Sequence, residues 1–600
     1  MNRLLTYYQK ELSFLKQHGK IFASRYPKIA RRLGIVEGET EDPHISRLIE
    51  SFALLTSRIH QRLDDDMPEL VNDLLAVLAP QLIKPLPSIC IVMVEPDPIH
   101  SGLTGKNTLA TDTALFFRHS TPVPYQFQTV YPVTLLPIYL KDALLHYNGD
   151  ALNWSLKLSF QVWSGATINN DTIRIYLNGP DNAVNIIYTF LCSEIESLIL
   201  NQEGKSSLLS PTDIKPVGFS KKESLLIKEP KISPVHNLLI DYFWFPQKFH
   251  FIDIQLPSNF CVKNNGLFEI KITFHNNQLT ENLGKITEII NSDFFRLHCT
   301  PAINLFSIRA EPFILEDTKA EYPVIPDTRH QSQLEVWSVQ KVSVQRKVNN
   351  SVQQFDIMPL LERHTDNSAD ENPGLYWQSF RRENLMPKGL EKKQYIAFSE
   401  QPNREVSSAP EVVTVNALCT NQYLPSKTQY FGNPDGDFDT DAPVASLKIT
   451  ALTHPTPPVE PASKNSVRWR FLSQFSLSHQ LLDGDEGVKK LKEILTLYNF
   501  NNRSSNSHLV SLIQTLDYRP ITARLISNDP HSLARGIDVI ITFKHDAIKE
   551  PEYYMLCCLL DHLLALYAPV NSFTRLTTCI AHEDQTRRVW PIRAARISWL

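Results

Sequence analysis

Residues 154–163 read WSLKLSFQVW, so an apolar side chain stands at every second position of this run. Strict alternation of this kind predicts a β-strand with one buried face. Similar runs, interrupted by proline and asparagine, are SICIVMVEP at 88–96, TPVPYQFQTVYPVTLLPIYL at 121–140 and DTIRIYLNGP at 171–180. We therefore expect short, mostly antiparallel strands from Ile89 onward.

The residues before Ile89 follow a different period. The sequence ISRLIESFALLTSRIHQRL at 45–63 places apolar side chains three and four positions apart, which is the spacing of one face of an α-helix. Two other sets have the same spacing: Leu5, Tyr8, Leu12 and Leu15, and Leu70, Leu74, Leu78 and Leu82. Because the second of these sets follows Met67-Pro68, and proline is tolerated in a first helical turn, we expect a separate helix there.

These patterns predict an α+β protein with an N-terminal helical region followed by several mostly antiparallel β-rich domains with interspersed helices. Further along the chain we expect helices at 183–200, 487–498 and 553–567, strands at 249–256, 334–339, 342–346, 411–418 and 537–543, an exposed loop at 361–374 and an acidic turn at 432–442. The aromatic run DYFWFPQKFHF at 241–251 is interpreted as a core-filling turn, and an aromatic binding platform is the alternative.

A chain of 600 residues is too long for one ordinary hydrophobic core, so several domains are expected. The clearest linker is HPTPPVEPASKN at 454–465, since clustered prolines favour an extended chain. The predicted division is a helical region at 1–88, a β-rich α+β domain at 89–320, a second β-rich domain at 321–453, the linker at 454–465 and a C-terminal α+β domain at 466–600.

The overall charge argues against one class of partner. Lys and Arg number 60 and Asp and Glu 64, a net charge of −4, so the chain lacks the basic excess of a dedicated nucleic-acid binder. Residues 1–36 nevertheless hold eight basic residues and one glutamate, whereas residues 37–73 hold ten acidic residues and three arginines. The two halves either complement one another within the protein, or the basic half docks on an acidic partner, an anionic membrane surface or nucleic acid.

The sequence also bears on cellular location. The first twenty residues interleave charged and apolar side chains and lack the apolar core of a secretory signal. The apolar stretch 553–570 contains Asp561 and His562, so we interpret it as a buried helix rather than a membrane span. The cysteines are Cys90, Cys192, Cys261, Cys299, Cys419, Cys557, Cys558 and Cys579. With no C-x-x-C pair among them, buried free thiols in a reducing cytosol are expected, and disulfide or metal use is the alternative.

No pattern specifies a catalytic site, a cofactor or a metal. Gly102–Thr108 has an incomplete likeness to a phosphate-binding loop, because the first glycine and the hydroxyl residue after lysine are missing. The alternating Asp435, Asp437, Asp439 and Asp441 lack the glycine and glutamate of a calcium loop. Asp64, Asp65 and Asp66 are consecutive in a predicted helix and diverge by about 100° each, so they cannot converge on one ion. We expect no enzyme and no cofactor.

Several strings distributed along the whole chain resemble one protein family. They are LTYYQKELSFL at 5–15, YPKIA at 26–30, DPH at 42–44, LDDDMPEL at 63–70, KPLPS at 84–88, YFWFPQKF at 242–249, TPAINLF at 300–306, LCTN at 418–421, SQFSL at 473–477 and VNSFT at 570–574. In these strings the chain resembles the TssF family, baseplate subunits of the bacterial type VI secretion system, which are similar to the wedge subunits of contractile phage tails.

The resemblance implies a structural protein of the baseplate wedge. As partners it implies TssG, in a ratio of two TssF copies to one TssG, together with TssK, TssE, the VgrG hub and the second TssF copy. It implies a cytoplasmic location at the cytoplasmic face of the inner membrane, and contact with the membrane only indirectly, through the membrane complex.

The N-terminal helices are the predicted partner interface, because amphipathic helices pack ridge into groove in bundles of this kind. The candidate interface residues are Tyr8, Leu12, Leu15, Ile45, Leu48, Phe52, Leu55 and Ile59. Two hypotheses from other functional classes stay open. One is a membrane-surface adaptor that uses the basic segment 1–32. The other is a polysaccharide-active or peptidase enzyme, which would need a convergent acid/base pair.

Overall fold

The computed structural model describes most of the chain. The residues described are 8–9, 11–15, 25–32, 35–36, 39–40, 43–118, 124–149, 152–202, 204–226, 234–316, 318–348, 351–360, 374–386, 389–400, 410–444, 446–460, 465–474, 484–501, 503–524, 533–566, 572–581 and 583–594. The chain forms two compact units, which we call the helical unit (Met1–Ile83 with Ala462–Ser476) and the β-rich unit (Lys84–Pro461 with Leu477–Leu600).

The helical unit is built around one long helix, α3 (Pro43–Leu78). The short helix α2 (Pro27–Arg32) precedes a small hairpin of β1 (Ile35–Val36) and β2 (Glu39–Thr40), and β2 packs against α3. The end of α3 packs against α8 (Asn465–Gln474), a segment almost 400 residues later in the sequence.

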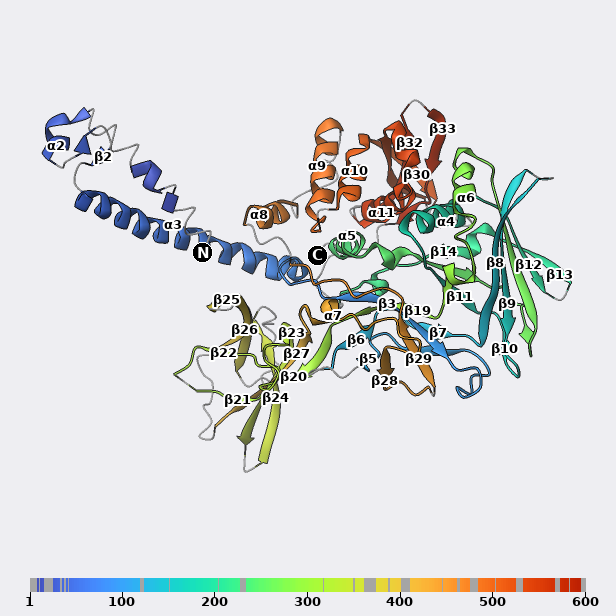
Figure 1. Cartoon of the computed structure of the whole chain (residues 1–600), viewed down its shortest axis with the longest axis horizontal. Coiled ribbons are helices and arrows are strands. Elements are labelled where there is room, and N and C mark those ends of the chain that lie inside the picture. Colours follow the sequence, from blue (N-terminus) through green and yellow to red (C-terminus); the bar gives the residue numbers. More distant parts are fainter. Residues whose placement is uncertain are drawn as a thin grey trace. The chain divides into compact units, whose positions relative to one another are not determined.

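At the centre of the β-rich unit is a closed barrel (Figure 1). Its strands, in order around the barrel, are β19 (Cys299–Ile303), β3 (Ile89–Pro96), β29 (Leu447–Ala451), β28 (Phe438–Thr440), β5 (Ala114–Phe117) and β6 (Gln126–Thr129). The core of the barrel is made of residues such as Val92, Val94 and Phe127, which are fully buried. Because β28 and β29 lie after residue 321 and the other strands before it, the barrel combines segments on both sides of the predicted boundary at 320/321.

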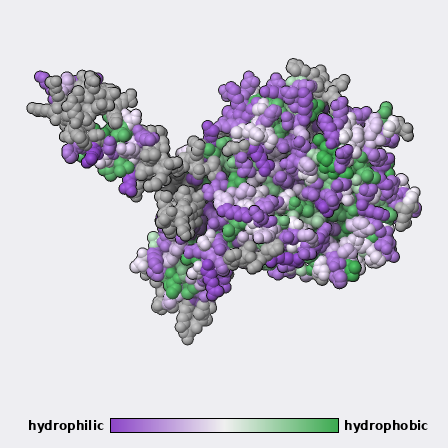
Figure 2. Space-filling view, in the orientation of Figure 1, coloured by the Kyte–Doolittle hydropathy of each residue, from purple (hydrophilic) through white to green (hydrophobic). Residues whose placement is uncertain are grey.

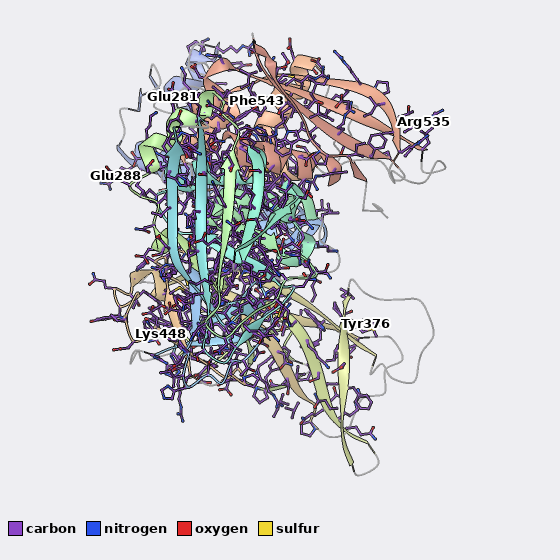
Figure 3. All side chains as sticks on the ribbon, turned by 90° about the vertical axis from the view of Figure 1, so that its right-hand side faces the viewer. Glu281, Glu288, Tyr376, Lys448, Arg535 and Phe543 are labelled. Atoms are coloured by element: carbon purple, nitrogen blue, oxygen red, sulfur yellow. The ribbon has the colours of Figure 1, made fainter. Side chains whose placement is uncertain are left out.

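The chain between the barrel strands β6 and β19 forms two further sheets. The five-stranded sheet contains β13 (Lys205–Leu209), β12 (Ile195–Gln202), β17 (Leu267–Phe274), β9 (Asn153–Val162) and β8 (Ile138–Asn148), and its strands lie side by side in Figure 3. The four-stranded sheet contains β14 (Ile214–Pro216), β15 (Phe251–Gln255), β11 (Thr172–Leu177) and β18 (Phe295–Leu297). Two small pairs join β4 (Asn107–Leu109) to β7 (Val133–Leu135) and β10 (Thr167–Ile168) to β16 (Val262–Lys263). The accompanying helices are α4 (Asp181–Ser193), α5 (Pro234–Trp244) and α6 (Glu281–Ile286).

The alternation that predicts β9 is confirmed in detail. Leu156, Leu158, Phe160 and Val162 are fully buried, whereas Lys157 on the other face pairs with Glu269 across the strands. The sheet therefore has one apolar buried face and one polar face.

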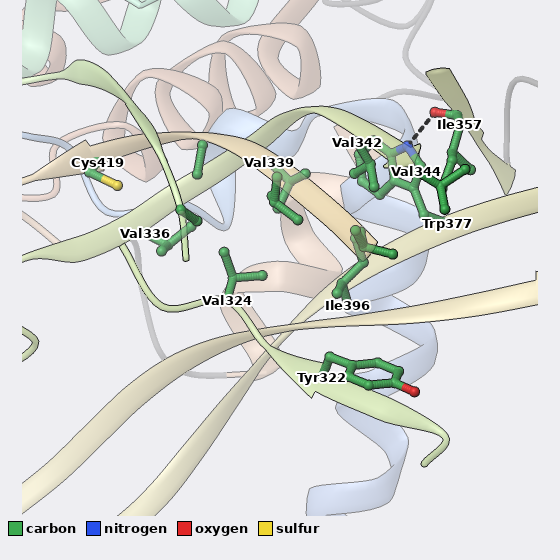
Figure 4. Packing of buried hydrophobic residues seen from close by; sticks show 14 of the residues in the cluster. Tyr322, Val324, Val336, Val339, Val342, Val344, Ile357, Trp377, Ile396 and Cys419 are labelled. Atoms are coloured by element: carbon green, nitrogen blue, oxygen red, sulfur yellow. Dashed lines mark hydrogen bonds between the residues drawn. The ribbon is translucent and has the colours of Figure 1, made fainter. Parts of the chain in front are cut away.

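A separate eight-stranded sheet, which we call the wing, extends from the barrel. It contains β20 (Phe306–Arg309), β27 (Val412–Thr420), β23 (Glu335–Val348), β24 (Ser351–Pro359), β25 (Leu375–Met386), β26 (Gly389–Glu400) and β22 (Glu321–Pro323), with β21 (Phe313–Ile314) beside β27. Its core packs Val342, Val344 and Ile396 around Trp377, whose indole N–H donates to the carbonyl of Ile357 (Figure 4).

The C-terminal part contains a sheet of β30 (Ile513–Arg524), β31 (Leu533–Phe543), β32 (Phe573–Ile580) and β33 (Glu583–Val589), with β34 (Arg593–Ala594) beside β32. It also contains α9 (Gly484–Leu497), α10 (Ser504–Ser511) and α11 (Tyr553–Leu566). Strands β31 and β32 are parallel and α11 connects them, as the geometry of a parallel pair requires. The carboxylate of Asp561, which the sequence places in the middle of this apolar helix, is paired with Arg593. The remaining short helix is α7 (Leu424–Lys427).

The α+β fold class is confirmed, and four local predictions need correction. Helix α3 runs without interruption through Met67-Pro68, so the separate helix predicted there is wrong. The helix predicted at 183–200 ends at Ser193, and the alternating residues after it form β12. The strands predicted at 334–339 and 342–346 are one strand, β23, with two bulges. The predicted turn at 241–251 is the end of α5 followed by a 3₁₀ turn at Pro246–Phe249, although its aromatic side chains are buried as expected.

The Pro-rich segment predicted as a linker is partly fixed in the β-rich unit. The backbone N–H of Thr456 donates to Ile89, and Leu86 and Val459 exchange two backbone hydrogen bonds. Helix α8, which follows this segment, belongs to the helical unit rather than to the C-terminal sheet. The loop predicted at 361–374 lies, except for Gly374, outside the described residues. The division into domains at residues 88, 320, 453 and 465 stays a prediction.

Among the described residues, none of the helices has the length and apolar character needed to cross a lipid bilayer.

Candidate functional site

Helix α3 carries a stripe of exposed apolar side chains. Leu48, Phe52, Leu55 and Ile59 are exposed by 71%, 62%, 59% and 60%. Their spacing of four, three and four residues puts them on one face of the helix. Figure 2 shows hydrophobic residues at the surface of this part of the chain. We call these four residues the α3 stripe.

The neighbouring face of α3 is buried within the helical unit. Ala53 and Ser57 are fully buried, and the Ser57 hydroxyl donates to the Leu54 carbonyl of the same helix at 2.7 Å. In the second half of the helix Val71 and Leu75 are fully buried, and Phe471 of α8, which packs against α3, is 2% exposed. One side of the helix therefore holds the unit together, and the α3 stripe lies outside that contact.

The other predicted interface residues are placed differently. Tyr8, Leu12 and Leu15 belong to a separate helical segment, residues 8–9 and 11–15, and are half-buried. Ile45 lies in α3, but its side chain is outside the described part of the structure. Of the eight predicted residues, the structure thus brings four together on one exposed face.

The acidic turn that has a partial likeness to a calcium loop serves as a structural cap. The Asp437 carboxylate is fully buried and accepts hydrogen bonds from the backbone N–H groups of Gly432 (2.9 Å), Asn433 (3.1 Å) and Ala451 (2.8 Å). Asp439 accepts a hydrogen bond from Arg118 at 2.6 Å. These oxygens are already engaged by donors, and no cluster of three or more metal-ligating side chains occurs in the described ranges.

Buried ionisable side chains in the β-rich unit are engaged in structural contacts. Asp241 and Lys248, which are both 1% exposed, form an ion pair across the turn between α5 and β15. Burial raises the pKa of the Asp241 carboxyl, and the ammonium group of Lys248 opposes part of that rise. The phenol of Tyr131 donates to the Lys248 carbonyl at 3.1 Å. This pair and the Tyr131 ring are buried among aromatic side chains.

Three buried histidines are neutral near pH 7. Burial lowers the pKa of His236, His250 and His298 to about 4 in each case. His236 bonds to the Tyr498 hydroxyl, and Nε2 of His298 accepts the backbone N–H of Leu136 at 3.1 Å. In neither of these two contacts does a histidine meet a carboxylate.

The thiol prediction is confirmed for most cysteines. Cys90, Cys299, Cys419, Cys557 and Cys558 are buried, Cys192 and Cys579 are half-buried, Cys261 is exposed, and all are free thiols. Burial raises the pKa of Cys192, Cys419 and Cys557 to about 12, so these thiols are protonated and poorly nucleophilic at neutral pH.

A cleft of about 720 Å³ is lined by strands β3 and β29 of the barrel, by β8 of the five-stranded sheet and by β18 of the four-stranded sheet. Four of its charged residues form two ion pairs: Lys448 with Glu95 at 3.4 Å and Arg296 with Asp293 at 3.0 Å. These two pairs neutralise four of the charges that line the cleft. The α3 stripe is the more distinctive surface.

Comparison with known proteins gives one consistent family. Residues 1–597 match the family model described as "Type VI secretion system, TssF". The chain is 25% identical over 622 residues to the type VI secretion system component TssF1 of Pseudomonas aeruginosa, and the match covers 98% of each protein.

Solved structures agree on the fold. One chain of the type VI secretion system TssK-TssF-TssG baseplate subcomplex, determined by cryo-electron microscopy, superposes with a TM-score of 0.72 at 21% identity, covering 91% of this chain and 98% of that one. A chain of the baseplate complex from the type VI secretion system gives a TM-score of 0.60 at 19% identity, covering 98% of this chain and 100% of that one.

Proposed function

The chain belongs to the TssF family of type VI secretion systems, and on that premise we propose that it is a structural subunit of the baseplate wedge. Its nearest partners are TssG and TssK, the two proteins named together with TssF in the structure that it resembles in fold. In this proposal two copies of the chain join one TssG, and the wedge then takes up TssE and surrounds the VgrG hub. The assembly stands in the cytoplasm against the inner membrane and supports growth and contraction of the sheath and tube.

The α3 stripe is the observation that carries this proposal. Soluble monomers seldom expose a continuous row of large apolar side chains, and such rows mark interaction sites. Full burial of a Leu, Ile or Phe side chain contributes roughly 1.5–3 kcal/mol, so the four residues of the stripe are sufficient to anchor one partner helix. A helix of TssG or of the second copy packed ridge into groove along α3 would bury them.

The role proposed is non-enzymatic. The buried ionisable groups of the β-rich unit are engaged in capping, ion pairing or core packing, as described for Asp437, Asp241 and His298. A wedge subunit needs stable surfaces rather than reactive groups, and the described part of the chain fits that requirement.

A membrane-surface adaptor is the second candidate, and one observation favours it. Around helix α2, the side chains of Arg25, Tyr26, Lys28 and Ile29 are all exposed, and basic residues mixed with apolar ones suit an anionic lipid surface. Co-sedimentation of the protein with anionic vesicles at increasing salt tests this. Binding that needs Arg25, Lys28, Arg31 and Arg32 and is lost with salt would favour the adaptor.

Co-expression with a TssG homologue tests the wedge proposal. We expect a complex whose mass corresponds to two copies of this chain and one TssG. Phe52→Asp should abolish co-purification because it places a charge in the centre of the α3 stripe, while the folded chain persists. Leu208→Asp is the matched control, since Leu208 is 77% exposed on the edge strand β13, and it should assemble normally.

Two results would count against the proposal. A chain that stays monomeric with TssG at micromolar concentration contradicts the wedge role itself. A Phe52→Asp chain that assembles like the wild type shows instead that the α3 stripe is not the interface.

A further inference from the structure

Strand β8 (Ile138–Asn148) is the outermost strand of the five-stranded sheet, whose strands lie side by side in Figure 3. It is 11 residues long, and of the strands that the structure describes only β9 pairs with it. An edge strand offers its outward backbone N–H and C=O groups to a strand of another chain. This edge is therefore a candidate surface for a partner.

The hydrogen bonds of β9 show which of its backbone groups point toward β8. The N–H of Trp163 donates to the Pro137 carbonyl, just before β8, at 2.9 Å. The N–H of Val162 donates to the Gly266 carbonyl, just before β17, at 3.0 Å. Neighbouring residues of an antiparallel strand bond to opposite sides. The odd-numbered residues of β9 therefore bond to β8, and the even-numbered residues bond to β17.

The register of the two strands then gives the outward groups of β8. After a bulge at Lys141, the residues opposite odd-numbered positions of β9 are Asp142, Leu144 and His146. The residues that direct their backbone N–H and C=O groups away from β9 are those that follow each of these three, namely Ala143, Leu145 and Tyr147. We call these last three residues the β8 edge.

The β8 edge lacks the features that normally keep edge strands from pairing. Proteins protect their edges with proline, charged side chains or short strands. The other long edge strand, β30, contains Pro520, and β22, at the end of the wing, is three residues long and contains Pro323. Residues 143–147 read ALLHY and contain neither proline nor Lys, Arg, Asp or Glu. The charged residues of β8, Lys141 and Asp142, precede them at the bulge.

Three side chains beside this edge are complementary to the same three side chains of a second copy. Leu144 is 50% exposed, and Asp142 and His146, two residues before and after it, are exposed on the same face of the sheet. In an antiparallel pair of two β8 strands centred on Leu144, the two Leu144 side chains lie opposite each other. Asp142 of each copy lies opposite His146 of the other, so a carboxylate meets an imidazole on both sides of the leucines.

The same alignment pairs the backbones. Ala143 of one copy lies opposite Leu145 of the other, and because both belong to the β8 edge, each such pair exchanges two N–H···O=C bonds. The sequence DALLH at 142–146 places the acid and the histidine symmetrically about Leu144. A pair of strands related by a twofold axis needs this symmetry, whereas pairing with an unrelated strand does not.

We propose that the chain binds a second copy of itself through β8, so that the two five-stranded sheets join across a twofold axis at Leu144. This goes beyond the proposed function, because it requires neither TssG nor the α3 stripe. The contact lies wholly in the β-rich unit, so the two contacts can be tested independently.

Sedimentation velocity of the full chain without TssG, from low to high micromolar concentration, tests the dimer. We expect the wild type to pass from monomer to dimer. Leu144→Glu faces Lys157 within its own chain but sets two carboxylates against each other at the centre of the dimer, so it should weaken the dimer by about tenfold or more. Leu208→Glu is the matched control, since Leu208 is 77% exposed on the opposite edge strand, β13, and it should dimerise like the wild type.

Single cysteines test the register. Residues opposite each other in a non-hydrogen-bonded antiparallel pair have Cα atoms about 4.5 Å apart, a distance that a disulfide spans. Leu144→Cys should therefore give a covalent dimer under mild oxidation. In His146→Cys the two Cα atoms would be roughly 14 Å apart, so this variant should not cross-link beyond the level of the wild type, whose Cys261 is already exposed.

Three results would overturn the proposal: a wild type that stays monomeric at every concentration, a Leu144→Glu chain that dimerises like the wild type, or equal cross-linking of the two cysteine variants. Phe52→Asp should leave the dimer intact. Loss of the dimer in that variant would mean that the α3 stripe joins the copies, which also contradicts the proposal. A wild type that dimerises through Leu144 but does not bind TssG supports this inference and contradicts the wedge role instead.

Discussion

At the scale of single residues, the Asp241–Lys248 pair shows how this protein places charge in an aromatic core. Both side chains are 1% exposed, and the partners lie seven residues apart on either side of the end of α5. An isolated charge at such a site is expensive, while a matched pair costs far less. The pair therefore fixes the geometry of the turn more than it adds stability.

Substitutions at this pair should be strongly non-additive. Lys248→Met leaves the Asp241 carboxylate buried without its partner and should lower the free energy of unfolding by ~3–5 kcal/mol. The double variant Asp241→Asn/Lys248→Met keeps an acceptor for the Leu225 N–H and removes both charges, so it should be more stable than Lys248→Met alone. Urea unfolding of the three proteins measures this. If the double variant is the least stable, the pair contributes net stability and the argument is wrong.

The buried histidines make stability depend on pH. His236, His250 and His298 have folded-state pKa values of about 4, below the ordinary value of 6.5. A lowered pKa means that the unfolded chain binds more protons between pH 6.5 and 4, so this stability is present above pH 6.5 and is lost as the pH falls to 4. The loss is ~3 kcal/mol for each histidine at pH 4.

Carboxyl groups with a raised pKa, among them Asp561, Asp241 and Glu552, oppose this trend, so the test compares variants. Burial raises the pKa of Asp561 to about 6 and raises that of Asp241, and these groups gain stability as the pH falls. His298→Gln keeps an acceptor for Leu136 but cannot be protonated. Between pH 7 and pH 4 the wild type should lose ~3 kcal/mol more than this variant in denaturant unfolding. Parallel pH profiles for the two proteins would show that His298 is not a buried neutral base.

The sequence predicts the burial of some of these residues but not their partners. Runs such as the one around Cys90 predict burial of the thiol because apolar neighbours surround it. The partner of a buried charge is set by tertiary packing, and a spacing of seven residues across a helix end has no periodic signature. Lys248 therefore could be predicted as part of an aromatic turn but not as a buried ion.

At the scale of elements, α3 shows both the strength and the limit of periodicity. The spacing of its apolar residues predicts the helix, but the proline at position 68 led to a predicted break that the structure does not have. Periodicity also cannot tell which apolar residues the chain covers itself. Leu74 and Leu78, which the helical spacing singles out, are 43% and 42% exposed, whereas Leu75, which it does not, is fully buried. The α3 stripe becomes visible only when the rest of the fold is in place.

This difference gives a prediction for the chain without partners. Because Phe52 is 62% exposed, Phe52→Ala should lower the free energy of unfolding by no more than ~1 kcal/mol, within the range of ordinary surface changes. Leu75→Ala removes a fully buried side chain and should cost ~2–5 kcal/mol. The free energies of unfolding of both variants are measured by denaturant unfolding, followed by the circular dichroism of the helices. Equal costs would mean that the α3 stripe is covered within the free chain.

At the scale of the whole molecule, elements that are neighbours in the fold are often far apart in the sequence. The barrel takes strands from residues 89–129, 299–303 and 438–451, and the wing is inserted between two of these segments. The sequence supplies the strands, because alternation is local, but the pairing of β3 with β29 joins residues some 350 positions apart and follows from packing. The same holds for α8, which joins α3 although it follows the wing in the sequence.

The two compact units should therefore respond differently to heat and to partners. The helical unit contains Met1–Ile83 and Ala462–Ser476, and so small a body buries proportionally less surface than the β-rich unit. We expect two unfolding transitions in calorimetry, the lower belonging to the helical unit.

Partner binding should then raise only the lower transition. A ligand that binds the folded helical unit at 100 times its Kd stabilises it by about 2.7 kcal/mol, so adding TssG should bring the two transitions closer together. Leu75→Ala identifies the helical transition, and Trp377→Phe identifies the transition of the β-rich unit. A single transition that both variants shift equally would mean that the units unfold together. A TssG-induced shift of the upper transition alone would place the partner on the β-rich unit and remove the α3 stripe from the interface.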